Sequence, residues 1–180
     1  MFNDETLYQA ILSADEKNQI GYARFLCERY LKNHPNHAPT LVIYACNLIS
    51  LSQYSEAEAA LDRAEPITPK DKLPFVIAQR GHLLVAKGDF VGAERIFMKA
   101  HELDPDDATF LIYAGSSASQ NGDIERAETL ARQATNCAKG CLDEAWYNLG
   151  GYLVSKKMYG EAAECYRQAL LIDPEYEIAI

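Results

Sequence analysis

Residues 143–174 read DEAWYNLGGYLVSKKMYGEAAECYRQALLIDP. In the second half of this stretch, Ala162 is followed four residues later by Tyr166, then by a second alanine, and finally by Pro174. The same order of alanine, larger residue, alanine and proline recurs along the chain, more loosely in some copies. Its leading alanines stand at positions 23, 57, 93, 127 and 162, so the steps are 34 to 36 residues long. A fixed period of this length is typical of stacked helical repeats.

A second set of small residues precedes the first. Twelve residues before four of the leading alanines stand Ala45, Gly81, Gly115 and Gly150. Larger apolar residues stand four positions earlier still, at Leu41, Ile77, Leu111 and Trp146. Between the two sets, Gly88-Asp89 and Gly122-Asp123 are turn signals, because glycine can end one helix in the left-handed conformation and aspartate can cap the next. Each repeat is therefore predicted to be a helical hairpin, and its small residues let stacked neighbours approach and bury one continuous core.

These positions resemble the tetratricopeptide repeat, most fully in residues 143–174 and more broadly over residues 4–176. The resemblance implies an all-α fold, an α-solenoid in which about five antiparallel helix-turn-helix units form a right-handed superhelix. The units are expected at 4–37, 38–73, 74–107, 108–142 and 143–176, with 177–180 as the start of a further unit or a tail. The resemblance also implies a module that binds other proteins and has no enzymatic activity.

In this family the first helices of the units line a groove that binds a partner protein. If the family geometry holds, the groove side chains are Tyr8, Gln9, Phe75, Gln79, His82, Tyr113, Ser116, Tyr147 and Asn148. None of these residues is Lys or Arg, which argues against the family's clamp for the terminal carboxylate of chaperones, because a bound carboxylate needs charged donors. Aromatic rings and amides favour an apolar or aromatic segment instead. Val42 and Ile43 either belong to the groove or pack between neighbouring first helices.

Composition excludes several other classes. The formal net charge of −9, without a dense stripe of Lys and Arg, argues against nucleic acid. Charged residues interrupt every apolar stretch before it reaches the roughly 20 residues of a membrane-spanning helix. The acidic start of the chain lacks the features of a secretory signal, and five cysteines without a regular framework favour a reducing compartment. A soluble, cytoplasmic protein is expected.

No motif predicts a catalytic residue, a metal site or a cofactor. Cys137 and Cys141 lie four residues apart, but no further metal ligands stand nearby, so we expect free thiols. His34 and His37 stand in a turn between units and are expected to be solvated. Nucleophile elbows and glycine-rich phosphate loops are absent from the sequence.

The residues after Pro174 look like the start of another first helix. The last complete helix should then expose an apolar strip that includes Leu170 and Leu171. Either the chain is cut from a longer protein, or a partner covers this strip, so self-association through this helix is possible. The sequence therefore favours a scaffold or adaptor that binds a protein segment. The alternatives are a dedicated chaperone or antagonist of one protein, and an accessory domain of a longer enzyme.

Overall fold

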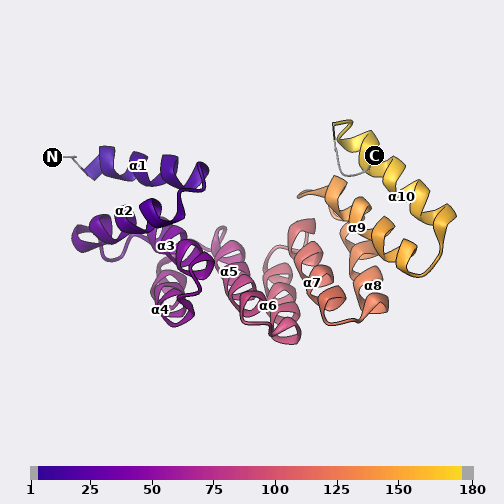
Figure 1. The fold of residues 1–180 in the computed structure, drawn as a ribbon, viewed down its shortest axis with the longest axis horizontal. Helices are drawn as coiled ribbons and strands as arrows, with labels where there is room; N and C mark the ends of the chain where they lie inside the picture. Colours follow the sequence, from indigo (N-terminus) through magenta and orange to yellow (C-terminus); the bar gives the residue numbers. More distant parts are fainter. Residues whose placement is uncertain (1–3, 176–180) are drawn as a thin grey trace. The chain divides into compact units, whose positions relative to one another are not determined.

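The computed structural model describes residues 4–175, so the predicted start of a further unit at 177–180 lies outside the described residues. The chain divides between Gly88 and Asp89 into two larger parts, each made of several helices. These parts are called the N-terminal unit and the C-terminal unit below. The N-terminal unit contains α1 (Asp4–Glu16), α2 (Ile20–Asn33), α3 (Ala38–Ser50), α4 (Tyr54–Ala64), the one-turn helix η1 (Glu65–Ile67) and α5 (Leu73–Ala86). The C-terminal unit contains α6 (Phe90–Leu103), α7 (Ala108–Gln120), α8 (Ile124–Ala134), α9 (Leu142–Ser155) and α10 (Tyr159–Ile172). Figure 1 labels the α-helices, and the predicted all-α class is confirmed.

Local sequence explains the turns between paired helices. Gly122 adopts a φ of 86°, and the Asp123 carboxylate accepts a hydrogen bond of 2.9 Å from the Arg126 amide at the start of α8. The Gly88-Asp89 turn has the same construction, as predicted. Three other turns place Asn18, Ser52 and Lys157 at positive φ, so the hairpin does not require glycine there.

Within the N-terminal unit, α2 packs against α1 and α3, and α4 packs against α3 and α5. The apolar stripes of these helices meet in two clusters, one around Ile11 and Leu26 and the other around Leu41 and Leu61. All four of these side chains are almost fully buried. Stacking against neighbours therefore gives each short hairpin the core that it could not form alone.

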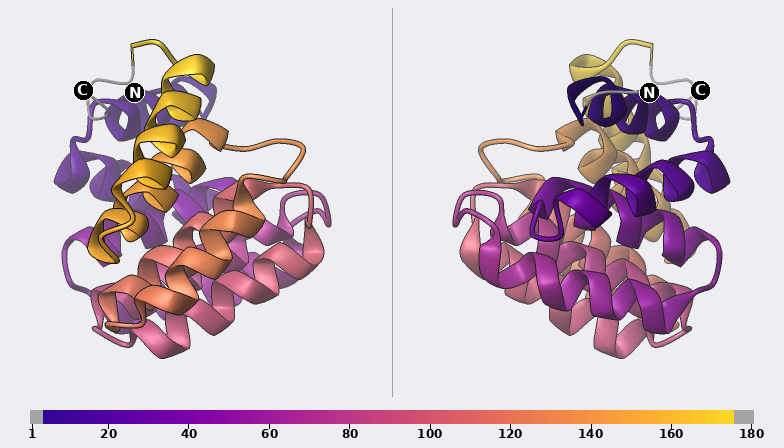
Figure 2. Two further views of the ribbon diagram at one scale, coloured as in Figure 1. Left: turned by 90° about the vertical axis from the view of Figure 1, so that its right-hand side faces the viewer. Right: turned by 90° about the vertical axis from the view of Figure 1, so that its left-hand side faces the viewer.

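Within the C-terminal unit, each helix from α7 to α10 lies against the one before it (Figures 1 and 2). Gly150 of α9 faces Tyr166 of α10 so closely that a Cβ atom at Gly150 would lie 2.6 Å from Tyr166 Cε1. The small residue that precedes each leading alanine therefore has the predicted role here. It permits close contact between the two helices of one hairpin.

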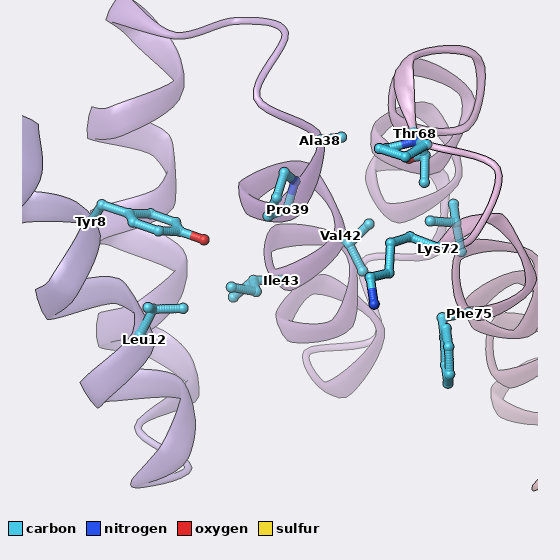
Figure 3. Close-up of a pocket in the computed structure, with 11 residues that line it drawn as sticks. Tyr8, Leu12, Ala38, Pro39, Val42, Ile43, Thr68, Lys72 and Phe75 are labelled. Carbon is cyan, nitrogen blue, oxygen red and sulfur yellow. The ribbon is translucent and has the colours of Figure 1, made fainter. Parts of the chain in front are cut away.

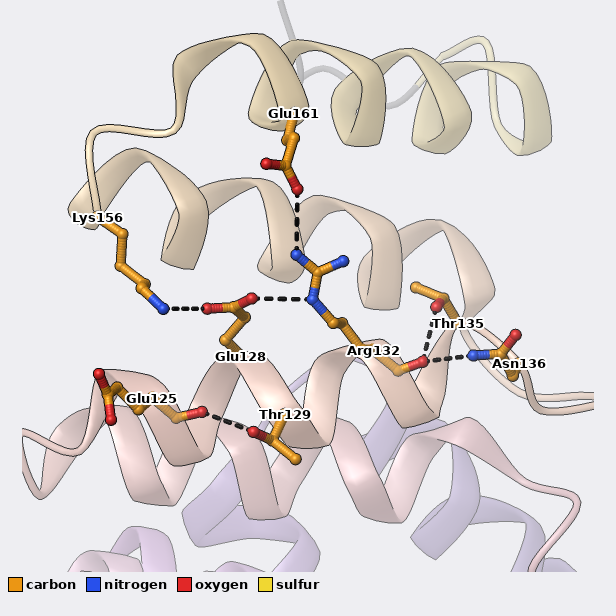
Figure 4. Close-up of polar contacts among 8 residues, drawn as sticks. All are labelled: Glu125, Glu128, Thr129, Arg132, Thr135, Asn136, Lys156 and Glu161. Carbon is orange, nitrogen blue, oxygen red and sulfur yellow. Dashed lines mark hydrogen bonds and ion pairs between the residues drawn. The ribbon is translucent and has the colours of Figure 1, made fainter.

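Ion pairs link the outer surfaces of the last three helices (Figure 4). Arg132 of α8 donates to Glu128 through Nε at 2.8 Å and lies 3.3 Å from Glu161 of α10 through Nη2. Lys156, in the turn before α10, contacts Glu128 at 2.7 Å. Hydrogen bonds from Lys156 and then from Arg132 lower the pKa of Glu128. The Glu128 side chain, only 13% exposed, thus contacts both cations, whereas Arg132 and Glu161 are 47% and 57% exposed and their pair contributes little to stability.

Candidate protein-binding groove

An apolar pocket of about 450 Å³ opens on the N-terminal unit, between α1, the start of α3 and the segment that leads into α5. Its lining consists almost entirely of aliphatic, aromatic and proline side chains (Figure 3). The lining residues are Tyr8, Leu12, Ala38, Pro39, Val42, Ile43, Thr68, Pro69, Lys72, Phe75 and Val76. This volume falls in the range of pockets that bind small ligands or a few side chains of a peptide.

Helical spacing explains how the apolar walls form. Tyr8 and Leu12 stand one turn apart on α1 and therefore face the same side. Val42 and Ile43 lie one turn into α3, and both also contact the buried clusters. Both residues thus pack on the core and also line this pocket. Phe75 stands at the start of α5 and is 44% exposed, so its ring is a large apolar surface in contact with water.

Tyr8 is held in place by other rings. Its ring centroid lies 5.6 Å from that of Tyr30 and 5.0 Å from that of His37. The His34 ring stacks on that of Tyr30, with the two ring centroids 4.4 Å apart. The expectation that His34 and His37 are merely solvated is therefore wrong. Both pack against Tyr30, which stands four residues before His34 and was the available signal. The contact of His37 with Tyr8 joins residues more than twenty positions apart and has no local signal.

One charged residue borders the pocket. Lys72 immediately precedes α5, and Figure 3 shows its ammonium group between α3 and Phe75. Its side chain is 69% exposed, and Nζ lies 3.8 Å from the carboxylate of the adjacent Asp71. Sequence reasoning missed Lys72 because family geometry assigns the groove to positions inside the first helices. Its place just before such a helix was the available signal.

The other groove candidates of the N-terminal unit do not line this pocket. Gln9 is exposed and donates a hydrogen bond of 3.2 Å to Glu5. Gln79 is half-buried and accepts a hydrogen bond from the Cys46 thiol at 3.2 Å. His82 is half-buried, and burial lowers its pKa. Of the predicted set in this unit, the pocket brings together Tyr8 and Phe75.

In the C-terminal unit, both tyrosines of the predicted groove pack against other rings. The Tyr113 ring lies 5.3 Å from the ring of the buried Phe97, and the Tyr147 ring lies 5.5 Å from that of Tyr166. Burial, followed by the charge of Glu144, raises the pKa of Tyr113. Both rings therefore contribute to packing within the unit.

The two polar candidates of this unit have side-chain partners. Ser116 hydrogen-bonds Tyr152, and Asn148 hydrogen-bonds Glu144. Burial and the nearby Asp143 raise the pKa of Glu144, and no cation of the described residues counteracts this effect. The half-buried Glu144 thus makes this surface polar and acidic.

The connection between α8 and α9 covers the start of α7. The amide of Ala108 donates to the carbonyl of Lys139 at 3.0 Å, and the amide of Lys139 donates to the carbonyl of Asp106 at 3.1 Å. The Lys139 ammonium also contacts the Asp104 carboxylate at 2.8 Å. Gly140 has a φ of 93° and lies so close that a Cβ atom there would collide with Asp107. The connection is therefore fixed on the start of α7 within the same unit.

The structure also bears on metal binding, membrane spanning and the state of the cysteines. Within residues 4–175, no group of three or more His, Cys, Asp or Glu side chains is placed to hold a metal ion. No helix of that range combines the length and apolar character needed to span a bilayer. All five thiols are free, and burial raises the pKa of Cys27 to about 12 and that of Cys46 to about 11. Both thiols therefore stay protonated, and the fully buried Cys27 packs as a small apolar side chain.

Two sequence models described as "Tetratricopeptide repeat" match residues 79–140 and 143–176, which together make up more than half of the chain. Cell division cycle protein 16 homolog of Homo sapiens is 26% identical over 168 residues, which cover 87% of this chain and 27% of that protein. The chain thus spans about a quarter of the length of this relative.

Solved structures give the same picture of the fold. The structure titled "Crystal structure of APC/C hetero-tetramer Cut9-Hcn1" aligns with a TM-score of 0.76 at 18% identity, over 98% of this chain and 35% of that one. A thermophilic TPR protein of Thermus thermophilus aligns with a TM-score of 0.76 at 19% identity, over 98% of this chain and 95% of that one. At such low identity these likenesses establish the fold alone. They agree with the predicted α-solenoid class.

Proposed function

Because the chain belongs to the tetratricopeptide repeat family, we propose that it is a non-enzymatic scaffold that binds an apolar or aromatic segment of a partner protein. The proposed site is the pocket between α1, α3 and the start of α5. The observation that carries the proposal is the apolar lining of this pocket, with the Phe75 ring 44% exposed at its edge.

Physical considerations support this choice of site. Apolar surface contributes about 25 cal/mol per Å² when it is removed from water, so an inserted side chain would stabilise a complex through the walls formed by Tyr8, Val42 and Phe75. Interface energies concentrate in a few aromatic residues at the centre of a pocket. Tyr8 is already held by Tyr30 and His37, so little side-chain entropy would be lost on binding.

We also propose a cellular location and a mode of self-association for this protein. We place it in the cytoplasm and expect no binding of nucleic acid, in keeping with the net charge of −9 and the five free thiols. Self-association through α10 is a further part of the proposal, because Leu171 and Ile172 are 69% and 49% exposed. Light scattering over a range of concentrations would detect it.

A matched pair of variants tests the proposed site. Phe75 and Ile67 belong to the same unit and are 44% and 42% exposed, but only Phe75 lines the pocket. We expect a partner captured from the native cell extract by the wild type and by Ile67→Ala to be lost or strongly reduced with Phe75→Ala. Circular dichroism should show equal helicity for all three proteins. Equal capture by Phe75→Ala would place binding elsewhere.

The captured partner also distinguishes a scaffold from a dedicated chaperone or antagonist. A dedicated partner would co-purify in fixed stoichiometry and raise the melting temperature of the array. A scaffold would bind short peptides of several proteins with modest affinity. Overlapping synthetic peptides of each captured protein, titrated against wild type and Phe75→Ala, would show which description holds.

A further inference from the structure

The pocket is bordered by positive charge as well as by apolar side chains. Lys72 is the only charged residue among those that line the pocket within the described chain. Its ammonium group lies between α3 and Phe75 (Figure 3). The nearest carboxylate paired with it is that of Asp71, at 3.8 Å, and both side chains are about 70% exposed. Such an exposed pair contributes little, so Asp71 does not hold the ammonium away from a ligand.

Two helix ends add to this positive charge. The lining residues Ala38 and Pro39 belong to the first turn of α3, and Phe75 and Val76 belong to the first turn of α5. The amino-terminal end of a helix carries a partial positive charge. Lys72 and both helix starts therefore act on the same opening. The chain as a whole has a net charge of −9, so the positive charge at this pocket is opposite in sign to the net charge of the chain.

We propose that the pocket selects a partner segment in which apolar side chains enter the cavity and an Asp or Glu side chain pairs with Lys72. This inference rests on the proposed function of the pocket and names the chemistry of its ligand. The carboxylate belongs to a side chain inside the segment, because a chain terminus needs several charged donors and the pocket lining offers one. The hydroxyl of Thr68, also in the lining, already donates to the Ala64 carbonyl at 2.7 Å.

The repeat itself supplies a contrast to this site. Nine residues before the small residues Gly81 and Gly150 stand Lys72 and Cys141, and six residues before them stand Phe75 and Glu144. The C-terminal unit thus has a thiol in place of the ammonium and a carboxylate in place of the aromatic ring. Selection for an acidic side chain is therefore a property of the N-terminal unit.

A peptide library tests the inference. Random nonapeptides displayed on phage would be selected in parallel on the immobilised full chain as wild type, Lys72→Gln, Lys70→Gln and Phe75→Ala. Lys70 is exposed, lies two residues from Lys72 and does not line the pocket, so Lys70→Gln removes the same charge outside the site. We expect wild type and Lys70→Gln to enrich apolar peptides that contain Asp or Glu. Lys72→Gln should enrich apolar peptides without this acidic preference.

Synthetic peptides then give the size of the effect. Changing the acidic residue of the strongest wild-type peptide to its amide should weaken binding to the wild type about two- to fivefold, the range for an exposed ion pair. The same change should leave binding to Lys72→Gln unaltered. Fluorescence anisotropy at low and high salt measures both, and high salt should remove the difference.

The outcomes separate the two proposals. Enriched apolar peptides without an acidic preference, or an acidic preference that survives in Lys72→Gln, would overturn the role of Lys72 and leave the pocket as the site. Peptides that bind Phe75→Ala as well as wild type would overturn the site itself. The absence of any peptide enriched by the wild type over a blank surface would reject the groove and this inference together.

Discussion

The start of α3 and the start of α7 occupy equivalent places in the repeat, nineteen residues before the leading alanines Ala57 and Ala127. At α3 the neighbouring chain leaves an apolar pocket. At α7 the connection 135–141 is hydrogen-bonded to the helix start, through Ala108 and Lys139. The same repeat thus presents an open surface in one unit and a covered one in the other.

The connections that follow the second helices explain this difference. Within the described chain, the backbone hydrogen bonds of residues 65–72 are local, as in the bond from the Lys72 amide to the Pro69 carbonyl. This connection therefore stays beside α5 and forms one wall of the pocket. In the other connection, Ala138 and Lys139 bond to Asp106 and Ala108, across more than thirty positions. The connections between repeats, as well as the helices, thus decide where the chain leaves an apolar pocket open.

The largest expected effect concerns the covered site. Gly140→Ala would introduce strain at a φ of 93° and place Cβ 2.9 Å from the Ala108 nitrogen, so we expect a loss of about 3 kcal/mol in the free energy of unfolding. Gly122→Ala is the control, because Gly122 has a φ of 86° with open space around it. The control substitution should lower the free energy of unfolding by only about 1 kcal/mol. Urea denaturation measures both, and equal losses would mean that the connection is not tightly fixed.

A second effect concerns Tyr113, which occupies the position of Ile43 in the other unit. Tyr113 packs on Phe97, so Tyr113→Ala should destabilise the protein by about 2 kcal/mol, less than for a fully buried ring. Tyr113→Phe keeps the ring and should stay within about 1 kcal/mol of wild type. Fluorescence of Trp146, the single tryptophan, reports on this unit during denaturation. Unchanged stability in Tyr113→Ala would favour a pure ligand-binding role for the ring.

A third effect concerns the residue that caps the start of each helix, which is His37 at α3 and Asp107 at α7. Nδ1 of the neutral His37 ring accepts a hydrogen bond of 3.4 Å from the Thr40 amide and lies 2.8 Å from the Thr40 hydroxyl. Burial, with a contribution from His34, lowers the pKa of His37 below its ordinary value of 6.5. The stabilisation is therefore complete above that value and is lost as the pH falls through the lowered pKa.

The measurement compares unfolding at about pH 7 and about pH 5. We expect wild type to lose less than about 1 kcal/mol through His37 over this range, because a capping bond is worth about that amount. His37→Asn keeps an acceptor that does not titrate, so its loss should be smaller. Part of the pH dependence should persist, because burial also lowers the pKa of His82. Identical profiles for both proteins would contradict this role of His37.

The smallest effect concerns Glu144, which stands where the other unit has Phe75. Burial and Asp143 raise the pKa of Glu144, so its ionised form opposes folding at neutral pH. Glu144→Gln should therefore stabilise the protein by less than about 1 kcal/mol near pH 7. This advantage should disappear once the pH falls below the ordinary value of 4.5, where the carboxyl is neutral in both states. A gain that persists in acid would implicate packing instead of charge.

Local sequence was sufficient to predict the helical hairpins, their period and the small residues that join them. Gly122-Asp123 predicted a turn that the structure contains, and Gly150 predicted the close contact with Tyr166. These features could be predicted because helix caps, turns and apolar spacing depend on residues a few positions apart. The groove residues taken from family geometry, such as Phe75 and Tyr147, stay a prediction for binding.

Which of the equivalent surfaces is open, and what charge borders it, depends on the packing of the folded chain. The Lys72 ammonium lies between α3 and Phe75, so this part of the pocket is formed by segments about thirty residues apart in the sequence, as with Val42 and Lys72. The covered start of α7 depends likewise on Gly140 meeting Asp107. Such contacts leave no periodic signal in the sequence, because each is made once, by side chains that meet only after the hairpins have stacked.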